Sequence, residues 1–208
     1  MALPRAKSSI PRYLHGSAFH QTPHRSPHAP ACSEVHRAIA SAAGTVYVGG
    51  MANYTWDQTF LELFDRCVTR YRAGDQDFTG YYSADDLAFL ASIGYKPREF
   101  FDFVEDFAEA GTPSASSAVL IAAVRRDYFI HVQKGTWSSR EMQADELPAR
   151  DAELDGIPWL PRILQKARNK LRGENCPDIM FGCGGDRRFL SQHDLHPADF
   201  LRVVWSAG

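Results

Sequence analysis

The chain has 208 residues, of which 44% are hydrophobic and 12% aromatic. This is enough apolar material for a buried core, and it argues against global disorder. No apolar run approaches the ~20 residues that a membrane-spanning helix needs, so we expect no integral membrane protein. The net charge of −2 is uneven: residues 1–50 carry five basic residues and one acid, which leaves 18 basic and 24 acidic residues beyond position 50. Because an acidic folded part repels phosphate backbones, we expect no nucleic-acid partner.

None of the four cysteines forms a CxxC pair: Cys32, Cys67, Cys176 and Cys183. No secretory signal is recognised ahead of them. Free thiols are typical of a reducing compartment. We therefore expect a cytoplasmic protein with mostly free thiols.

The first 50 residues differ in composition from the rest. Residues 1–33 contain no Asp or Glu, and five prolines would interrupt any helix there: Pro4, Pro11, Pro23, Pro27 and Pro30. The acid-poor, Arg- and Ser-containing composition fits an organellar transit peptide, although it lacks an amphipathic helix. A metal-binding tract is a second interpretation, because ligand-type residues recur every four positions: His20, His24, His28, Cys32 and His36. We favour a third interpretation, a disordered extension over 1–50 with an alternative translation start at Met51.

Beyond Met51 the chain repeats itself at an offset of 100 residues. The apolar positions of one amphipathic helix align without a gap on those of another: Phe60, Leu63, Phe64, Cys67 and Tyr71 with Leu160, Ile163, Leu164, Ala167 and Leu171. Further on, identical residues keep the same offset: Asp86, Phe89, Leu90, Pro97, Phe100 and Val104 with Asp186, Phe189, Leu190, Pro197, Phe200 and Val204. The sequence therefore predicts two tandem three-helix units related by a pseudo-two-fold duplication.

Each unit is predicted to contain three helices. The first helices span 57–73 and 158–172 and end at glycines suited to a left-handed cap: Gly74 and Gly173. The second begins after Ser83, where Asp86 completes a capping box, and near Gly184 in the other copy. The third helices begin with a proline near the first helical position, where the missing N–H costs nothing: Pro97 and Pro197.

A further helix over 114–134 has no counterpart in the second copy. Its apolar side is predicted to consist of six residues: Ala118, Leu120, Ile121, Val124, Tyr128 and Val132. We therefore predict an all-α fold in one domain, with 51–135 holding the first unit and the extra helix, 136–157 a linker, and 158–208 the second unit. The two units are expected to pack through their Phe-rich third helices.

Several segments of the second unit resemble a family of small bacterial helical proteins described only as a domain of unknown function: PWLPRILQKARNKLRG, FGCGGDRRFL and HPADFLRVV. Segments of the first unit resemble versions of that family with two related halves: FLELFDRCVTRYRAG, AFLASIGYKPREFFDFVEDF and AAVRRDYF. The resemblance covers about residues 57–205. It implies the helical two-half fold, and it brings no reaction, ligand or cofactor.

The most unusual segment places three glycines around Cys183 at a helix start. Backbone N–H groups there, with Arg187 or Arg188, can hold an anion, and a thiol there can act as a nucleophile. Against this, no histidine is placed to act as a base, and the first copy has Ser83 at the equivalent position. A Gly-rich turn around a half-buried cysteine explains the pattern without any function.

Asp86 and Asp186 are the only acids identical between the copies. They are either two carboxylates facing a shared cleft, used for acid–base work or a cation, or first-turn acids that cap helix amides. His193 and His196 are weak candidates for metal ligands, because no third ligand is indicated. A basic helix face is either solvated or open to an acidic partner: Arg162, Lys166, Lys170 and Arg172.

No nucleotide-binding, hydrolase or metalloprotease motif is present, and we predict no metal and no cofactor. The leading hypothesis is a helical binding or interaction module that takes a small acidic ligand or a partner at the seam between the units. Its ligand-binding candidates are Arg187, Arg188, Arg162 and Lys166. The alternative is a small-molecule enzyme whose catalytic candidates are Cys183, Asp186 and, across the seam, Asp86. A homodimer that fills the seam with a second chain is a third reading.

Overall fold

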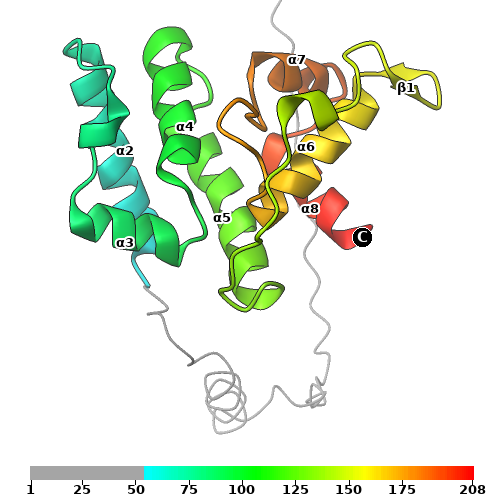
Figure 1. Cartoon of the computed structure of the whole chain (residues 1–208). Coiled ribbons are helices and arrows are strands. Elements are labelled where there is room, and N and C mark those ends of the chain that lie inside the picture. The colour runs from blue at the N-terminus through cyan, green and yellow to red at the C-terminus, as the bar shows by residue number, and fades with distance from the viewer. Residues whose placement is uncertain (1–53) are drawn as a thin grey trace, which may run out of the picture. The chain divides into compact units, whose positions relative to one another are not determined.

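The first half of the fold, from α2 to the end of α4, contains three α-helices whose ends are set by local chemistry. The computed structural model describes residues 54–208 and shows α2 (Trp56–Arg72), the 3-10 turn η1 (Phe78–Gly80), α3 (Ala84–Ser92) and α4 (Pro97–Ala110). Ser83 and Asp86 form the predicted capping box at the start of α3, and Pro97 opens α4. Helix α2 packs along α4 through its buried aromatic face (Figure 1).

Helix α5 (Ala115–His131) lies between the two halves. It contacts α2 on one side, and α6 and α8 on the other. The expectation that the third helices form the main contact between the halves was therefore wrong, since α4 packs on α2, whereas α8 packs on α5 and α6. Because α5 is covered on two sides, its apolar residues do not follow one stripe: Leu120 and Val132 are 42% and 46% exposed.

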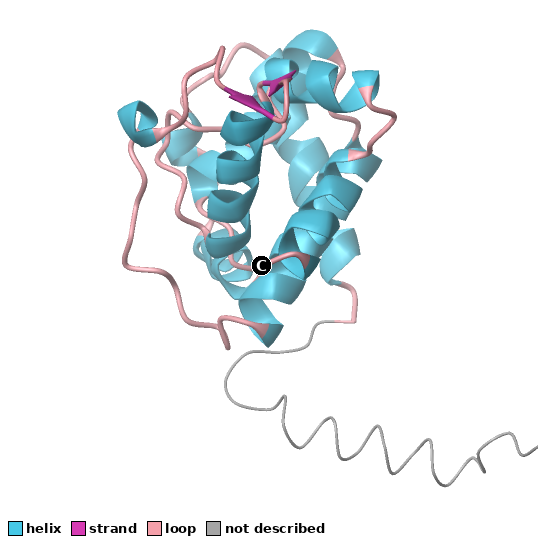
Figure 2. Ribbon diagram, turned by 90° about the vertical axis from the view of Figure 1, so that its right-hand side faces the viewer, coloured by secondary structure: helices cyan, strands magenta, loops and turns pink. Residues whose placement is uncertain are grey.

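Residues 136–157, predicted as a linker, contain structure of their own. They hold η2 (Ala144–Glu146) and β1 (Glu153–Leu154), which pairs antiparallel with β2 (Ile157–Pro158). Asp155 and Gly156 connect the strands with φ of 53° and 75°, the positive values that a tight hairpin turn requires. Figure 2 shows this hairpin beside the helices that make up almost all of the fold. It leads directly into α6 and positions Trp159 at the start of that helix.

The second half contains α6 (Leu160–Arg172), α7 (Gly184–Gln192) and α8 (Pro197–Ser206). Helices α3 and α7 begin and end 100 positions apart, which agrees with the offset in the sequence. One apolar core runs through both halves, from Phe60 in α2 through Ile121 in α5 to Leu201 in α8. A second, smaller cluster lies beside it: Met142, Leu147, Cys176 and Ile179. The all-α prediction is confirmed; the duplication stays a prediction.

None of the helices within residues 54–208 is long and apolar enough to cross a membrane. The expectations for residues 1–51 concern residues outside the described part of the chain. They include the tract from His20 to His36, the transit peptide and the start at Met51.

Candidate functional site

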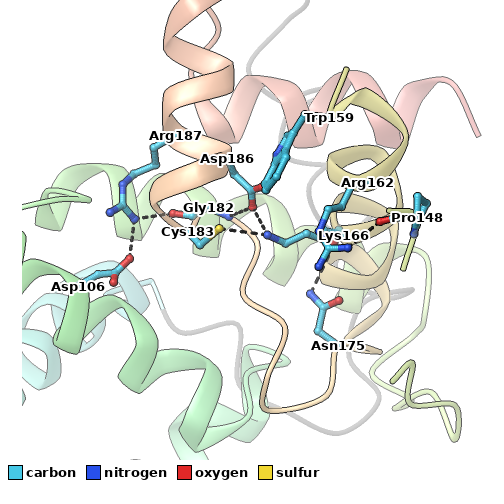
Figure 3. A network of polar contacts seen from close by, with 10 residues as sticks. All are labelled: Asp106, Pro148, Trp159, Arg162, Lys166, Asn175, Gly182, Cys183, Asp186 and Arg187. Carbon is cyan, nitrogen blue, oxygen red and sulfur yellow. Dashed lines mark hydrogen bonds and ion pairs between the residues drawn. The ribbon is translucent and has the colours of Figure 1, made fainter. Parts of the chain in front are cut away.

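A buried ion pair lies under the start of α7. Lys166 comes from α6 and Asp186 from the first turn of α7, and their side chains are 5% and 0% exposed. Lys166 Nζ lies 2.5 Å from Asp186 Oδ2, which also accepts a hydrogen bond from the Gly182 N–H at 2.9 Å. The Trp159 indole N–H donates to Asp186 Oδ1 at 3.0 Å. Three donors therefore hold this carboxylate in place (Figure 3).

Cys183 occupies the N-cap position of α7 and contacts the same ammonium. Its Sγ lies 3.3 Å from Lys166 Nζ, and the residue is half-buried. Gly185 allows Trp159 to pack against the helix start, because a Cβ at position 185 would lie 2.9 Å from the Trp159 ring. Gly185 thus serves close packing, and the Cys183 thiol faces a lysine instead of a histidine.

A cavity of about 180 Å³, here called the cysteine cavity, opens beside this thiol. Four charged side chains line it: Arg150, Arg162, Lys166 and Asp178. The rest of its wall is Cys183 and a largely apolar group: Leu147, Trp159, Ile179 and Met180. Arg162 is fixed by a 2.6 Å hydrogen bond from its guanidinium to the Pro148 carbonyl, and it lies over the Trp159 ring. The cavity therefore combines basic groups, a thiol and an apolar wall.

The first half contains an exposed version of the same ion pair. Arg66 Nη2 lies 2.6 Å from Asp86 Oδ1, and their side chains are 57% and 16% exposed. Burial alone would raise the pKa of Asp86, but hydrogen bonds from Ser83 and Arg66 outweigh it and hold that pKa below its usual value. Asp86 is thus a capping acid on the surface of its own half. The structure does not bring it to Cys183, because it binds Ser83 and Arg66 instead.

The remaining predicted residues lie elsewhere. The Arg187 guanidinium turns away from the thiol and binds Asp106 and the Gly182 carbonyl, each at 2.6 Å (Figure 3). Arg188 is exposed. His193 packs against Phe189, with ring centroids 4.6 Å apart. Within residues 54–208, no group of three or more His, Cys, Asp or Glu side chains is arranged to hold a metal ion.

A larger, more open cavity of about 580 Å³ lies at the seam, between the α4–α5 and α7–α8 turns. There Ser117 Oγ lies 3.2 Å from His196 Nε2, which suggests a nucleophilic serine. The Ala198 N–H, however, donates to His196 Nδ1, so in the neutral ring the proton is on Nε2. Because Nε2–H must then donate to Ser117, it cannot take the hydroxyl proton. This cavity therefore lacks an activated nucleophile.

In the basic face predicted for α6 the two lysines are buried, whereas the Arg172 side chain is 43% exposed. Lys166 and Lys170 are 4% and 2% exposed. Lys170 Nζ lies 2.7 Å from Glu99 Oε1 and 4.1 Å from the centre of the Tyr95 ring. Nearby, burial raises the pKa of Asp102 to about 7, although Arg98 and Lys170 act to lower it. The ion pair of Lys170 with Glu99 joins the two halves inside the molecule and, unlike Lys166, lines neither cavity.

Trp159 and Arg150 were not among the predicted site residues. The Asp155–Gly156 turn is a sequence signal for the hairpin that precedes α6, and it would have drawn attention to Trp159. Arg150 has no comparable signal, because it reaches the cavity from an irregular segment.

No protein-family model, curated protein or solved structure matches the chain. The resemblance to a bacterial family therefore stays a prediction.

Proposed function

We propose that the chain binds a small acidic molecule in the cysteine cavity. The charge of the cavity wall supports this, because Arg150, Arg162 and Lys166 face a single acid, Asp178. Asp186 neutralises Lys166, so the two arginines provide the excess positive charge. A guanidinium carries five N–H donors in a planar fork that suits a carboxylate. One N–H group of Arg162 donates to the Pro148 carbonyl, and its other N–H groups are available to a ligand within reach.

The volume and the wall narrow the class of ligand. The cavity volume of about 180 Å³ is that of about six water molecules at ~30 Å³ each. It therefore suits a short-chain carboxylic acid. Leu147, Ile179 and Met180 favour a ligand with an apolar body over a bare inorganic anion. The seam cavity suits an acid less well, because its two aspartates, Asp194 and Asp199, face one arginine already paired with Asp106.

A titration followed by NMR tests this proposal, with short-chain monocarboxylates and inorganic phosphate as probes. We expect saturable shifts with the monocarboxylates, weaker binding of phosphate, and loss of binding in Arg162→Gln. Arg168→Gln is the matched control, since Arg168 lies on the same helix and is exposed. Equal binding by the two variants, or no shift with any probe, contradicts the proposal.

A second candidate function, an enzyme with Cys183 as nucleophile, is favoured by the 3.3 Å contact between Lys166 Nζ and Cys183 Sγ. An ammonium beside sulfur is the kind of environment that supports a reactive thiolate. Alkylation rates of the folded protein test this reading. We expect Cys183 to react faster than the buried Cys67 and Cys176, and Lys166→Gln to slow Cys183 alone. An unchanged alkylation rate of Cys183 in Lys166→Gln contradicts the proposal that Cys183 is a nucleophile.

A further inference from the structure

We propose that Cys183 and Lys166 form an oxidative modification site, at which hydrogen peroxide converts their contact into a covalent sulfur–nitrogen cross-link. This inference does not rest on acid binding. It starts from the distance of 3.3 Å between Lys166 Nζ and Cys183 Sγ, which a small movement can close to a bond. The two residues come from different helices, so the bond would tie the start of α7 to α6.

The surroundings of the two atoms differ in a way that suits this chemistry. Cys183 is half-buried and lines the cysteine cavity, which gives a small oxidant a route to the sulfur. Lys166 is 4% exposed, and its ammonium contacts Asp186 and Cys183. The amine is thus held beside the sulfur, where it can intercept an oxidised thiol before a second oxidant molecule arrives.

The reaction proceeds in two balanced steps. Hydrogen peroxide first oxidises the thiol to a sulfenic acid and is reduced to water. The Lys166 ammonium then gives one proton to Asp186 Oδ2, 2.5 Å away, and the free amine attacks the sulfenic sulfur. The N–S bond forms as the S–O bond breaks, and the departing hydroxide takes a second proton from nitrogen and leaves as water. The buried ion pair becomes a neutral acid and a neutral cross-link, so no unpaired charge stays inside.

The first half shows that the fold does not require this pair. At the equivalent positions it carries Arg66 and Ser83, which both donate hydrogen bonds to Asp86. A hydroxyl cannot form a sulfenic acid, and a guanidinium is a far weaker nucleophile than an amine because it stays protonated. The second half therefore has both reactive groups where the first half has neither.

Peptide mass spectrometry after peroxide treatment tests the inference. We expect a peptide pair joined between Lys166 and Cys183 that has lost two hydrogen atoms and separates again with dithiothreitol. Lys166→Arg and Cys183→Ser reproduce the residues of the first half, and circular dichroism checks that both variants fold. In Lys166→Arg we expect the sulfenic acid to accumulate and to react with a dimedone probe, whereas the wild type labels weakly at Cys183.

Three results would overturn the inference. The first is Cys183 recovered as sulfinic or sulfonic acid without a cross-link. The second is equal dimedone labelling in the wild type and in Lys166→Arg. The third is a Cys183 that peroxide leaves unchanged. Cys67 and Cys176 are internal controls, because both are buried and we expect neither to be linked to a lysine.

Discussion

Replacing Asp102 by Asn is expected to stabilise the protein at neutral pH. Asp102 is 7% exposed, and burial raises its pKa from 3.8 to about 7, although Arg98 lies 3.0 Å away. A difference of about three pH units corresponds to about 4 kcal/mol at 25 °C. Because ionising this carboxyl in the folded state carries that penalty, Asp102→Asn can raise the free energy of unfolding by up to about 4 kcal/mol near pH 8.

The pH dependence gives the sign of this effect. Between pH 3.8 and about 7 the folded state retains a proton on Asp102 that the unfolded chain has lost, so the stability of the wild type falls as pH rises through this range. Urea unfolding at a series of pH values measures it. The stability gained in Asp102→Asn over the wild type should vanish near pH 4. Asp199→Asn, which changes an exposed carboxyl, should show no such dependence of its stability on pH. A variant less stable than the wild type at pH 8 would refute the reasoning.

Breaking the two equivalent ion pairs should lower the free energy of unfolding by unequal amounts. Arg66→Met should lower it by less than about 1 kcal/mol, whereas Lys166→Met leaves a buried carboxylate unpaired and should lower it by about 3–5 kcal/mol. Equal losses in urea unfolding would contradict this difference in burial. Gly185→Ala should cost about 1–3 kcal/mol through its clash with Trp159, and Gly184→Ala, with no close neighbour, should be neutral or stabilising. A Gly185→Ala variant as stable as the wild type would show that Trp159 does not pack against position 185. On α5, Ile121→Ala should lower the free energy of unfolding by about 2–5 kcal/mol, while Leu120→Ala should change it by less than about 1 kcal/mol. The reverse order would place the wrong face of α5 in the core.

The helices were predictable because short-range chemistry sets their ends. Ser83 with Asp86, and the prolines at 97 and 197, each act within one turn of chain. The apolar face of α5 was predicted less well. A periodic pattern identifies the buried side of a helix covered on one side, but α5 is covered by α2 on one side and by α6 and α8 on the other. The exposure of Leu120 follows from that packing and not from its neighbours in sequence.

Some residues of the candidate site were named from the sequence, but their arrangement was not predicted. Cys183, Asp186, Lys166 and Arg162 were all named from the sequence, and the structure places them together. Arg187 was grouped with Cys183 because the two are close in the chain. Its side chain binds Asp106 in α4 instead, and no local rule reveals that acid as its partner. Contacts between residues far apart in the chain depend on the path of the turns, which composition and spacing do not fix.

The position of α5 has a consequence for how the molecule unfolds. Arg125 of α5 is fully buried and donates a hydrogen bond to the Leu171 carbonyl at the end of α6. Its guanidinium also fills the space beside Gly94, which follows α3 in the first half, and beside Gly173, which caps α6 in the second. Removing either half would leave this cation and one apolar side of α5 in water. We therefore expect residues 54–208 to melt in a single cooperative transition, with equal calorimetric and van't Hoff enthalpies. Neither half is therefore expected to fold on its own.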